Sequence, residues 1–239
     1  FSGIVSLNQN YTTRGFKYLK KVKSLKTSHS NFNLQYIHSL ILLKKFEEAF
    51  TFSKSIWNKD ELFFEVDLLL GLQSFIKKDY KTAKKHFERL NYISESNLLF
   101  DNFFGNILIT WIEASQNNRV ESNKFFARVP KRYGNLKNIQ NSLLNCYFDT
   151  PETESSFKKL IGDETTGFSR YNFFLVNYLL SKNQISSAET LIKGSTNNFN
   201  QNLLMKQVKN FIQKKNYKKI KNLFNCENPK ENIAEMFYV

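Results

Sequence analysis

The sequence predicts an all-α protein, a solenoid of about seven antiparallel helix-turn-helix units, and three observations predict it. A pattern of small and apolar residues returns every 32 to 39 residues along most of the chain. Glycine and proline are rare, with 8 Gly and 3 Pro in 239 residues, which argues against a β-sandwich or a Gly-rich nucleotide-binding fold. The 24 Phe and 11 Tyr residues argue against disorder, because disordered chains are poor in aromatic residues.

The clearest unit spans residues 68–90. Its apolar first half leads to a polar turn at residues 77–79, and a second helix follows. Offsets of four and seven place Ala83, Phe87 and Leu90 on one helical face. A small residue in each helix lets the two backbones approach closely, and the aromatic residue after the turn is expected to pack between them. The packing of this unit should therefore depend on Gly71, Tyr80, Ala83, Phe87 and Leu90.

The same pattern recurs along the chain when the small residue of the second helix is taken as an anchor. The anchors are Gly15, Ala49, Ala83, Ser122, Ser156, Ala188 and Ile220. The residues expected to follow the turn are Phe46, Tyr80, Ile185 and Tyr217. The match is strongest in the first three units and weakens from the fifth onward, so the register of units four to seven stays open. A single continuous array over residues 1–239 is expected, because stacked repeats share one core.

These residues give the chain a resemblance to the tetratricopeptide-repeat (TPR) family, whose units are helical hairpins of about 34 residues. The resemblance is carried by Leu70, Gly71, Tyr80, Ala83, Phe87, Leu90 and the segment Lys45-Phe46-Glu47-Glu48-Ala49-Phe50. It is clearest over residues 35–90, while residues 101–239 would form divergent repeats. Ile37 stands where the family has a small residue, and units five to seven also fit hairpins of a related solenoid. The resemblance implies a right-handed superhelix of the divergent kind common in bacterial proteins.

The chain is basic, with 35 Lys+Arg against 21 Asp+Glu and a formal net charge of +14. Most basic residues fall outside the expected first helices, so we interpret them as the solvated exterior of the array. No apolar stretch approaches the roughly 20 residues of a membrane-spanning helix, and this portion is expected to be soluble. The chain begins Phe-Ser-Gly without Met, which we interpret as part of a longer protein. Its compartment, cytoplasm or cell envelope, and its oligomeric state stay open.

Motifs for catalysis are not found in the sequence. It has no Gly-rich phosphate loop, zinc-peptidase helix or nucleophile elbow. His29, His38 and His86 are scattered and share no metal-ligand spacing. Cys146 and Cys226 are interpreted as reduced packing residues. The sequence therefore predicts a protein that is not an enzyme and uses no metal or cofactor.

The resemblance implies a binding groove and not a catalytic site, because first helices line the concave face in the family. The candidate groove residues are His38, Leu72, Phe75, Trp111, Phe173, Asn177 and Lys209. A wall that is mostly apolar, aromatic and amide suits an extended segment or a helix of a partner protein. Each of these side chains has an alternative role, which is to pack against the next repeat.

The favoured function is a protein-interaction scaffold or adaptor that holds a peptide or partner protein in this groove. The alternative is an electrostatic module that docks on nucleic acid or an anionic membrane surface, using the lysine-rich segment at residues 206–221. A third interpretation is an accessory repeat domain of a larger enzyme. The identity of the partner stays open in all three.

Overall fold

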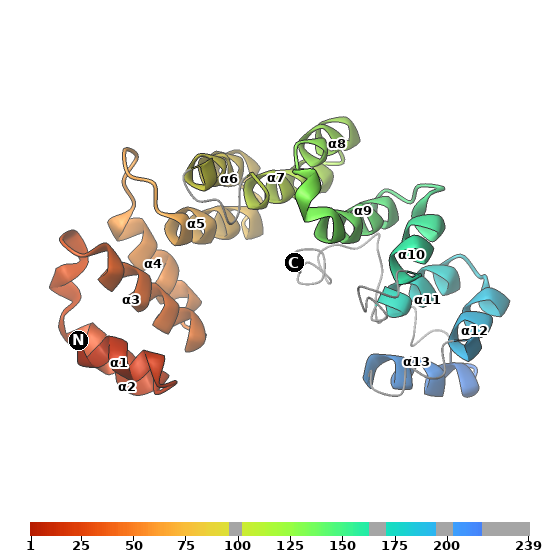
Figure 1. Cartoon of the computed structure of the whole chain (residues 1–239), viewed down its shortest axis with the longest axis horizontal. Coiled ribbons are helices and arrows are strands. Elements are labelled where there is room, and N and C mark those ends of the chain that lie inside the picture. Colours follow the sequence, from red (N-terminus) through yellow and green to blue (C-terminus); the bar gives the residue numbers. More distant parts are fainter. Residues whose placement is uncertain (96–101, 163–170, 195–202, 217–239) are drawn as a thin grey trace. The chain divides into compact units, whose positions relative to one another are not determined.

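The computed structural model describes residues 1–95, 102–162, 171–194 and 203–216 (Figure 1). Within these ranges it contains thirteen α-helices, two short 3-10 helices and no strand, so the prediction of an all-α protein is confirmed. The chain divides into two compact units, Phe1–Val129 and Pro130–Val239. None of the described helices combines the length and the apolar character needed to cross a membrane.

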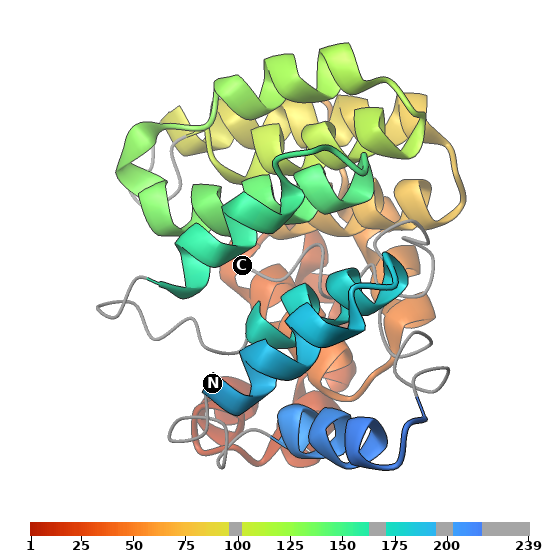
Figure 2. The ribbon, with the colours of Figure 1, turned by 90° about the vertical axis from the view of Figure 1, so that its right-hand side faces the viewer.

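The first unit is a series of helices that each pack against the next one along the chain. Its elements are α1 (Ser2–Asn8), α2 (Thr12–Lys21), η1 (Lys23–Thr27), α3 (Ser30–Leu42), α4 (Phe46–Ile56), α5 (Phe64–Ile76), α6 (Tyr80–Glu95), α7 (Phe104–Ser115) and α8 (Arg119–Ala127). Short turns join α1 to α2, α3 to α4, α5 to α6 and α7 to α8, which makes the two helices of each pair antiparallel neighbours (Figures 1 and 2).

The second unit follows the same plan. Its elements are η2 (Lys131–Tyr133), α9 (Gly134–Tyr147), α10 (Thr153–Ile161), α11 (Asn172–Ser181), α12 (Ile185–Gly194) and α13 (Leu203–Gln213). Helix α10 packs against α9 and α11, and α11 also contacts α12 and α13. Both units are therefore built from helices that meet their neighbours in sequence.

Seven turns share one backbone geometry that ends a helix and redirects the chain. In each turn one residue adopts a left-handed conformation, with φ between 49° and 63°. Its N–H donates to the carbonyl three positions earlier, and the next N–H donates to the carbonyl five positions before it, over 2.8–3.2 Å. This is the Schellman pattern, which satisfies carbonyl groups left unpaired at a helix end. The left-handed residues are Asn10, Lys44, Lys78, Asn117, Asp149, Asn183 and Lys215.

None of these seven positions is a glycine, although glycine is the residue that adopts positive φ most readily. Asn and Asp tolerate the left-handed region better than most side chains, and they occupy four of the seven turns. The scarcity of glycine in the sequence thus coexists with frequent sharp turns. The turn residues follow one another at intervals of 34, 34, 39, 32, 34 and 32 residues.

Small residues fill the points where the paired helices approach most closely. Ala49, Ala83, Ser122 and Ala188 are fully buried, and each lies five positions after a left-handed turn residue. Gly15 has the same offset and is also buried. The expected anchor Ile220 and the turn residue Tyr217 lie outside the described residues.

The fifth hairpin departs from the predicted register. The sequence predicts Ser156 as its anchor, but this residue is half-buried, and its hydroxyl donates to the Thr153 carbonyl over 2.8 Å. Thr153 is the fully buried small residue here, and it lies four positions after Asp149 instead of five. Phe157 and Leu160 follow it at the offsets of four and seven seen in α6. The anchor is therefore Thr153, and the assignment of Ser156 is wrong.

The α5–α6 hairpin shows why a small residue is needed in the first helix. A Cβ atom added to Gly71 would lie 2.2 Å from a ring carbon of Phe87, which is fully buried. Leu90 is 1% exposed on the same face of α6. Tyr80 is half-buried and meets the Phe75 ring edge-on, with centroids 5.8 Å apart.

One other expectation is corrected by the structure. Phe46 and Ile185 follow their turns as Tyr80 does, yet they are 48% and 37% exposed, so they do not pack between their helices. Cys146 is buried, as expected of a packing residue. Cys226 lies outside the described residues.

Candidate functional site

The structure buries most of the predicted groove residues. Phe75, Trp111, Phe173 and Asn177, on α5, α7 and α11, are between 1% and 7% exposed. Asn177 donates its side-chain amide to the Phe173 carbonyl over 2.7 Å, so these two residues are in direct contact. Burial gives these four side chains a packing role and leaves them little surface for a partner.

The remaining three predicted residues reach the surface to different extents. Leu72 on α5 is half-buried, whereas His38 on α3 and Lys209 on α13 are exposed. Neither His38 nor Lys209 makes a described hydrogen bond or ion pair through its side chain. These three residues come from separate helices and share no described cavity.

Three surface cavities lie elsewhere in the described part of the chain, and none of them is lined by a predicted groove residue. The first lies between η1, α3 and α4 and has a volume of about 340 Å³. The second, of about 460 Å³, lies between α4, α5 and α6. The third, of about 330 Å³, lies between α10, α11 and α12. All three occur where one helical pair meets the element before it.

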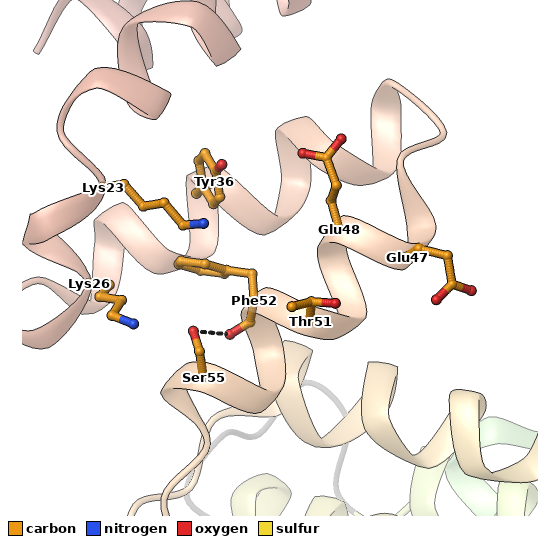
Figure 3. Close-up of a pocket in the computed structure, with 8 residues that line it drawn as sticks. All are labelled: Lys23, Lys26, Tyr36, Glu47, Glu48, Thr51, Phe52 and Ser55. Carbon is orange, nitrogen blue, oxygen red and sulfur yellow. Dashed lines mark hydrogen bonds between the residues drawn. The ribbon is translucent and has the colours of Figure 1, made fainter.

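The cavity between η1, α3 and α4 has an aromatic floor (Figure 3). The rings of Tyr36 and Phe52 meet edge-on, with centroids 4.7 Å apart. The Lys23 ammonium lies 5.8 Å from the Phe52 ring and 6.0 Å from the Tyr36 ring, and Figure 3 shows it beside both. Glu47 and Glu48 form the acidic side of the cavity, and Glu47 points away from the rings.

Two ionisable groups of this cavity have shifted pKa values. Burial raises the pKa of Tyr36 above its ordinary value, and the negative charge of Glu48 acts in the same direction. A hydrogen bond from Lys45 lowers the pKa of Glu48 below its ordinary value. Two lysines and two glutamates line this cavity, so their formal charges balance.

A buried carboxylate organises the second cavity. Asp67, in the first turn of α5, is fully buried, and its Oδ1 accepts hydrogen bonds from three side chains. Their donor atoms are Trp57 Nε1 at 3.1 Å, His86 Nδ1 at 2.8 Å and Arg89 Nε at 3.0 Å. A buried charge is stable only when it is paired and hydrogen-bonded, and Asp67 meets both conditions.

Arg89 extends this network to the loop between α4 and α5. Its terminal nitrogens donate to the backbone carbonyls of Asn58, Lys59 and Glu61. Its guanidinium carbon also lies 5.3 Å from the centre of the Trp57 ring. One arginine therefore joins α6, the buried carboxylate of α5 and the backbone of the loop.

His86 and Trp57 carry this network to the wall of the second cavity. Their rings meet edge-on, with centroids 5.8 Å apart, and both line the cavity. The other lining residues are Lys54, Leu70, Gln73, Ser74, Lys77, Asp79, Thr82 and Lys85. The Ser74 hydroxyl donates to the Leu70 carbonyl over 2.8 Å, so it is engaged within its own helix.

This arrangement is suited to binding a ligand through fixed donors. Within the described residues, no group of three or more His, Cys, Asp and Glu side chains could hold a metal ion. Asp67 fixes one nitrogen of the His86 ring and thereby sets the direction of the other. The lysines that line the cavity supply positive charge.

No sequence motif links Trp57, Asp67, Gln73 and Arg89 as a group. One signal was available, because Asp67 interrupts the apolar run Val66-Asp67-Leu68-Leu69-Leu70. A carboxylate on an otherwise apolar helix requires a buried cationic partner. His86 and Arg89 lie one helical turn apart on α6 and provide it.

Comparisons with protein-family models, with curated proteins and with solved structures found no match to this chain.

Proposed function

We propose that this chain is a TPR-like array of seven helical hairpins that acts as a non-catalytic scaffold for a partner protein. The regular series of turns supports this architecture, because each left-handed residue is followed by the next after 32 to 39 residues. Stacked hairpins of this kind present extended surfaces for binding proteins and peptides.

The observation that carries the proposal is a set of large apolar side chains exposed near the turns of the second and third hairpins, α3–α4 and α5–α6. Leu42 is 52% exposed, Phe46 48% and Ile76 68%. Leu42 and Ile76 are 34 residues apart and occupy corresponding positions, two residues before the left-handed Lys44 and Lys78. Exposed apolar residues that recur at equivalent positions are suited to contact an amphipathic segment of a partner.

The distribution of charge favours a protein partner over a polyanion. Five described lysines form ion pairs with carboxylates close to them, which reduces the positive charge offered to a phosphate backbone. The pairs are Lys45–Glu48, Lys84–Glu113, Lys124–Glu121, Lys158–Glu154 and Lys182–Asp149. Docking on nucleic acid or an anionic membrane remains the alternative function, supported by the net charge of +14.

A peptide selection tests the scaffold function. A displayed peptide library is selected on the wild-type chain, and the affinity of each selected peptide is measured for Leu42→Glu/Ile76→Glu. We expect this variant to lose at least about tenfold in affinity, because two charges would enter an apolar contact. Both substituted residues are exposed, so the fold should be retained.

Thr13→Glu/Asn31→Glu is the matched control, since both residues are exposed on helices and the charge change is the same. This control should bind the selected peptides as the wild type does. Equal affinity for Leu42→Glu/Ile76→Glu would contradict the proposal. Binding of random DNA or RNA that persists at about 200 mM salt would favour the electrostatic alternative.

A further inference from the structure

We propose that the cavity between α4, α5 and α6 is a binding site for a phosphate monoester. The ligand would be a compact organic group that carries one phosphate, either a small molecule or a phosphorylated side chain of a peptide. This site is separate from the exposed apolar residues on which the scaffold proposal rests, so the two can fail independently.

Two polar side chains in the wall of this cavity are nine-tenths buried and have capacity for a ligand. His86 is 9% exposed, and Asp67 occupies its Nδ1, which leaves Nε2 as the ring nitrogen without a described partner. Gln73 is 7% exposed, and no hydrogen bond joins its side-chain amide to the described residues. Both side chains line the cavity, so their polar atoms without described partners are available to a ligand that enters it.

Charge distinguishes this cavity from the other two. Its lining includes Lys54, Lys77 and Lys85 against one acid, Asp79, which gives 3 − 1 = +2. None of these three lysines forms an ion pair with the described residues. The Asp79 carboxylate accepts a hydrogen bond from the Thr82 N–H over 3.1 Å, which commits it to the start of α6.

The other two described cavities have no excess of positive charge. The cavity of Figure 3 has two lysines and two glutamates, or 2 − 2 = 0. The cavity between α10, α11 and α12 has one lysine and one glutamate, or 1 − 1 = 0. A phosphate monoester carries a charge between about −1.5 and −2 near pH 7, which matches the excess of +2 around His86.

The cavity also offers an apolar surface for the rest of the ligand. Trp57 and Leu70 line it together with the polar groups, and its volume is about 460 Å³. That volume exceeds the space that one phosphate needs and suits a small organic ester. The donors are pre-organised, because Asp67 holds both the Trp57 indole and the His86 ring in place.

The test is a titration of the whole chain with phenyl phosphate, followed by NMR and calorimetry. The chain has two tryptophans, and the indole N–H signal of Trp57 reports directly on the Asp67 network. We expect phenyl phosphate to shift this signal and to bind more tightly than benzoate, which has the same ring and a single negative charge. Equal binding of both compounds, or no shift with either, would overturn the proposal.

Two variants locate the site on these residues. Lys54→Ala/Lys77→Ala/Lys85→Ala should weaken phenyl phosphate binding by about tenfold or more, because charge-assisted contacts are lost. Gln73→Leu, which keeps the side chain's size and leaves the Asp67 network intact, should weaken it several-fold. The control Lys17→Ala/Lys20→Ala/Lys81→Ala removes the same charge from exposed residues outside the cavity and should bind like the wild type. An equal loss in the control triple would mean that only net charge attracts the ligand, and it would overturn the proposal.

A short phosphoserine peptide and its unphosphorylated form identify the source of the phosphate. Tighter binding of the phosphopeptide than of phenyl phosphate would support a phosphorylated protein partner. Tighter binding of phenyl phosphate would support a small phosphorylated molecule. Binding of the unphosphorylated peptide with equal affinity would contradict a phosphate site.

Discussion

Charged residues differ in burial and pairing between the α5–α6 hairpin and the region formed by η1, α3 and α4. In the hairpin, Asp67 is fully buried and is held by donors from α6 and from the preceding loop. In the second region, Glu48 stays at the surface, where it pairs with Lys45 three residues away in sequence. The buried interaction joins separate elements, whereas the surface pair is local.

This difference determines how much each charge contributes to stability. A buried carboxylate that loses its partners leaves an uncompensated charge in the interior, and this is costly. A surface pair is screened by water and salt and contributes little. Substitutions in the two regions should therefore differ in size, and each of the following predictions tests that comparison.

The largest effect is expected for Asp67→Asn. It removes the negative charge beside Arg89, whose side chain is mostly buried, and should lower the free energy of unfolding by about 3 kcal/mol. Urea denaturation followed by tryptophan fluorescence measures the change. Glu65→Gln, two residues earlier on α5 and half-exposed, makes the same change in charge and should cost less than about 0.5 kcal/mol. Equal effects of the two substitutions would contradict the role given to Asp67.

The next effect concerns the close approach of α5 and α6. Gly71→Ala would place a Cβ 2.2 Å from the Phe87 ring and should destabilise the chain by about 1–3 kcal/mol through overpacking. Gly134→Ala, at the start of α9, is the matched control, because a Cβ there meets nothing within 4 Å. The control should leave stability unchanged or raise it slightly. A neutral Gly71→Ala in thermal unfolding would show that the helices can separate without cost.

A smaller effect of opposite sign is expected at the turns. Lys78 has φ 60°, and Lys78→Gly should stabilise the chain by up to about 1 kcal/mol, because glycine adopts this conformation without strain. The same substitution at Lys44 should have a similar effect, since its φ is 57°. Lys77→Gly is the control, because its φ of −77° suits any residue and glycine there adds only flexibility. A lower urea midpoint for Lys78→Gly than for the wild type would contradict the inference that the left-handed conformation of Lys78 is strained.

The smallest effect belongs to the surface pair. Glu48→Gln should change the free energy of unfolding by less than about 0.5 kcal/mol, because the side chain is 49% exposed. The pKa of Glu48 is lowered in the folded chain, so its contribution is present above the unfolded-state pKa and is lost as pH falls through the folded-state pKa. The difference between wild type and variant should therefore be seen at neutral pH and disappear in acid. A difference that grows in acid would contradict this sign.

Local sequence patterns predicted much of the helical framework. Ala83, Phe87 and Leu90, chosen for their spacing, are 0–1% exposed on one face of α6. Thr153 was missed because its β-branched side chain does not belong to the small residues sought, and because its hairpin has one residue fewer between the turn and the anchor. The polar turn at residues 77–79 is predicted from the sequence, but the left-handed conformation of the turn residues is not, because lysine and asparagine carry no signal comparable to glycine.

The site was less predictable than the framework. No sequence spacing links His86 to Asp67, which lies 19 residues away, or to Trp57. The position of Phe75 and Trp111 on first helices predicts that they line a groove, but that position does not reveal which face of the helix is covered, and both are buried. Cavities depend on how three helices meet, so Gln73 and the three lysines around it carried no recognisable pattern.

The sequence by itself determined the helical class and the recurrence of small and apolar residues, because both depend on interactions within a few residues of the chain. The tertiary structure decided which charges are buried and which side chains form a cavity. Asp67 meets donors 10, 19 and 22 residues away, and only the packing of α5 against α6 and the preceding loop brings them together. The physical reason is that desolvation and pairing depend on distances in space, which a one-dimensional pattern does not contain.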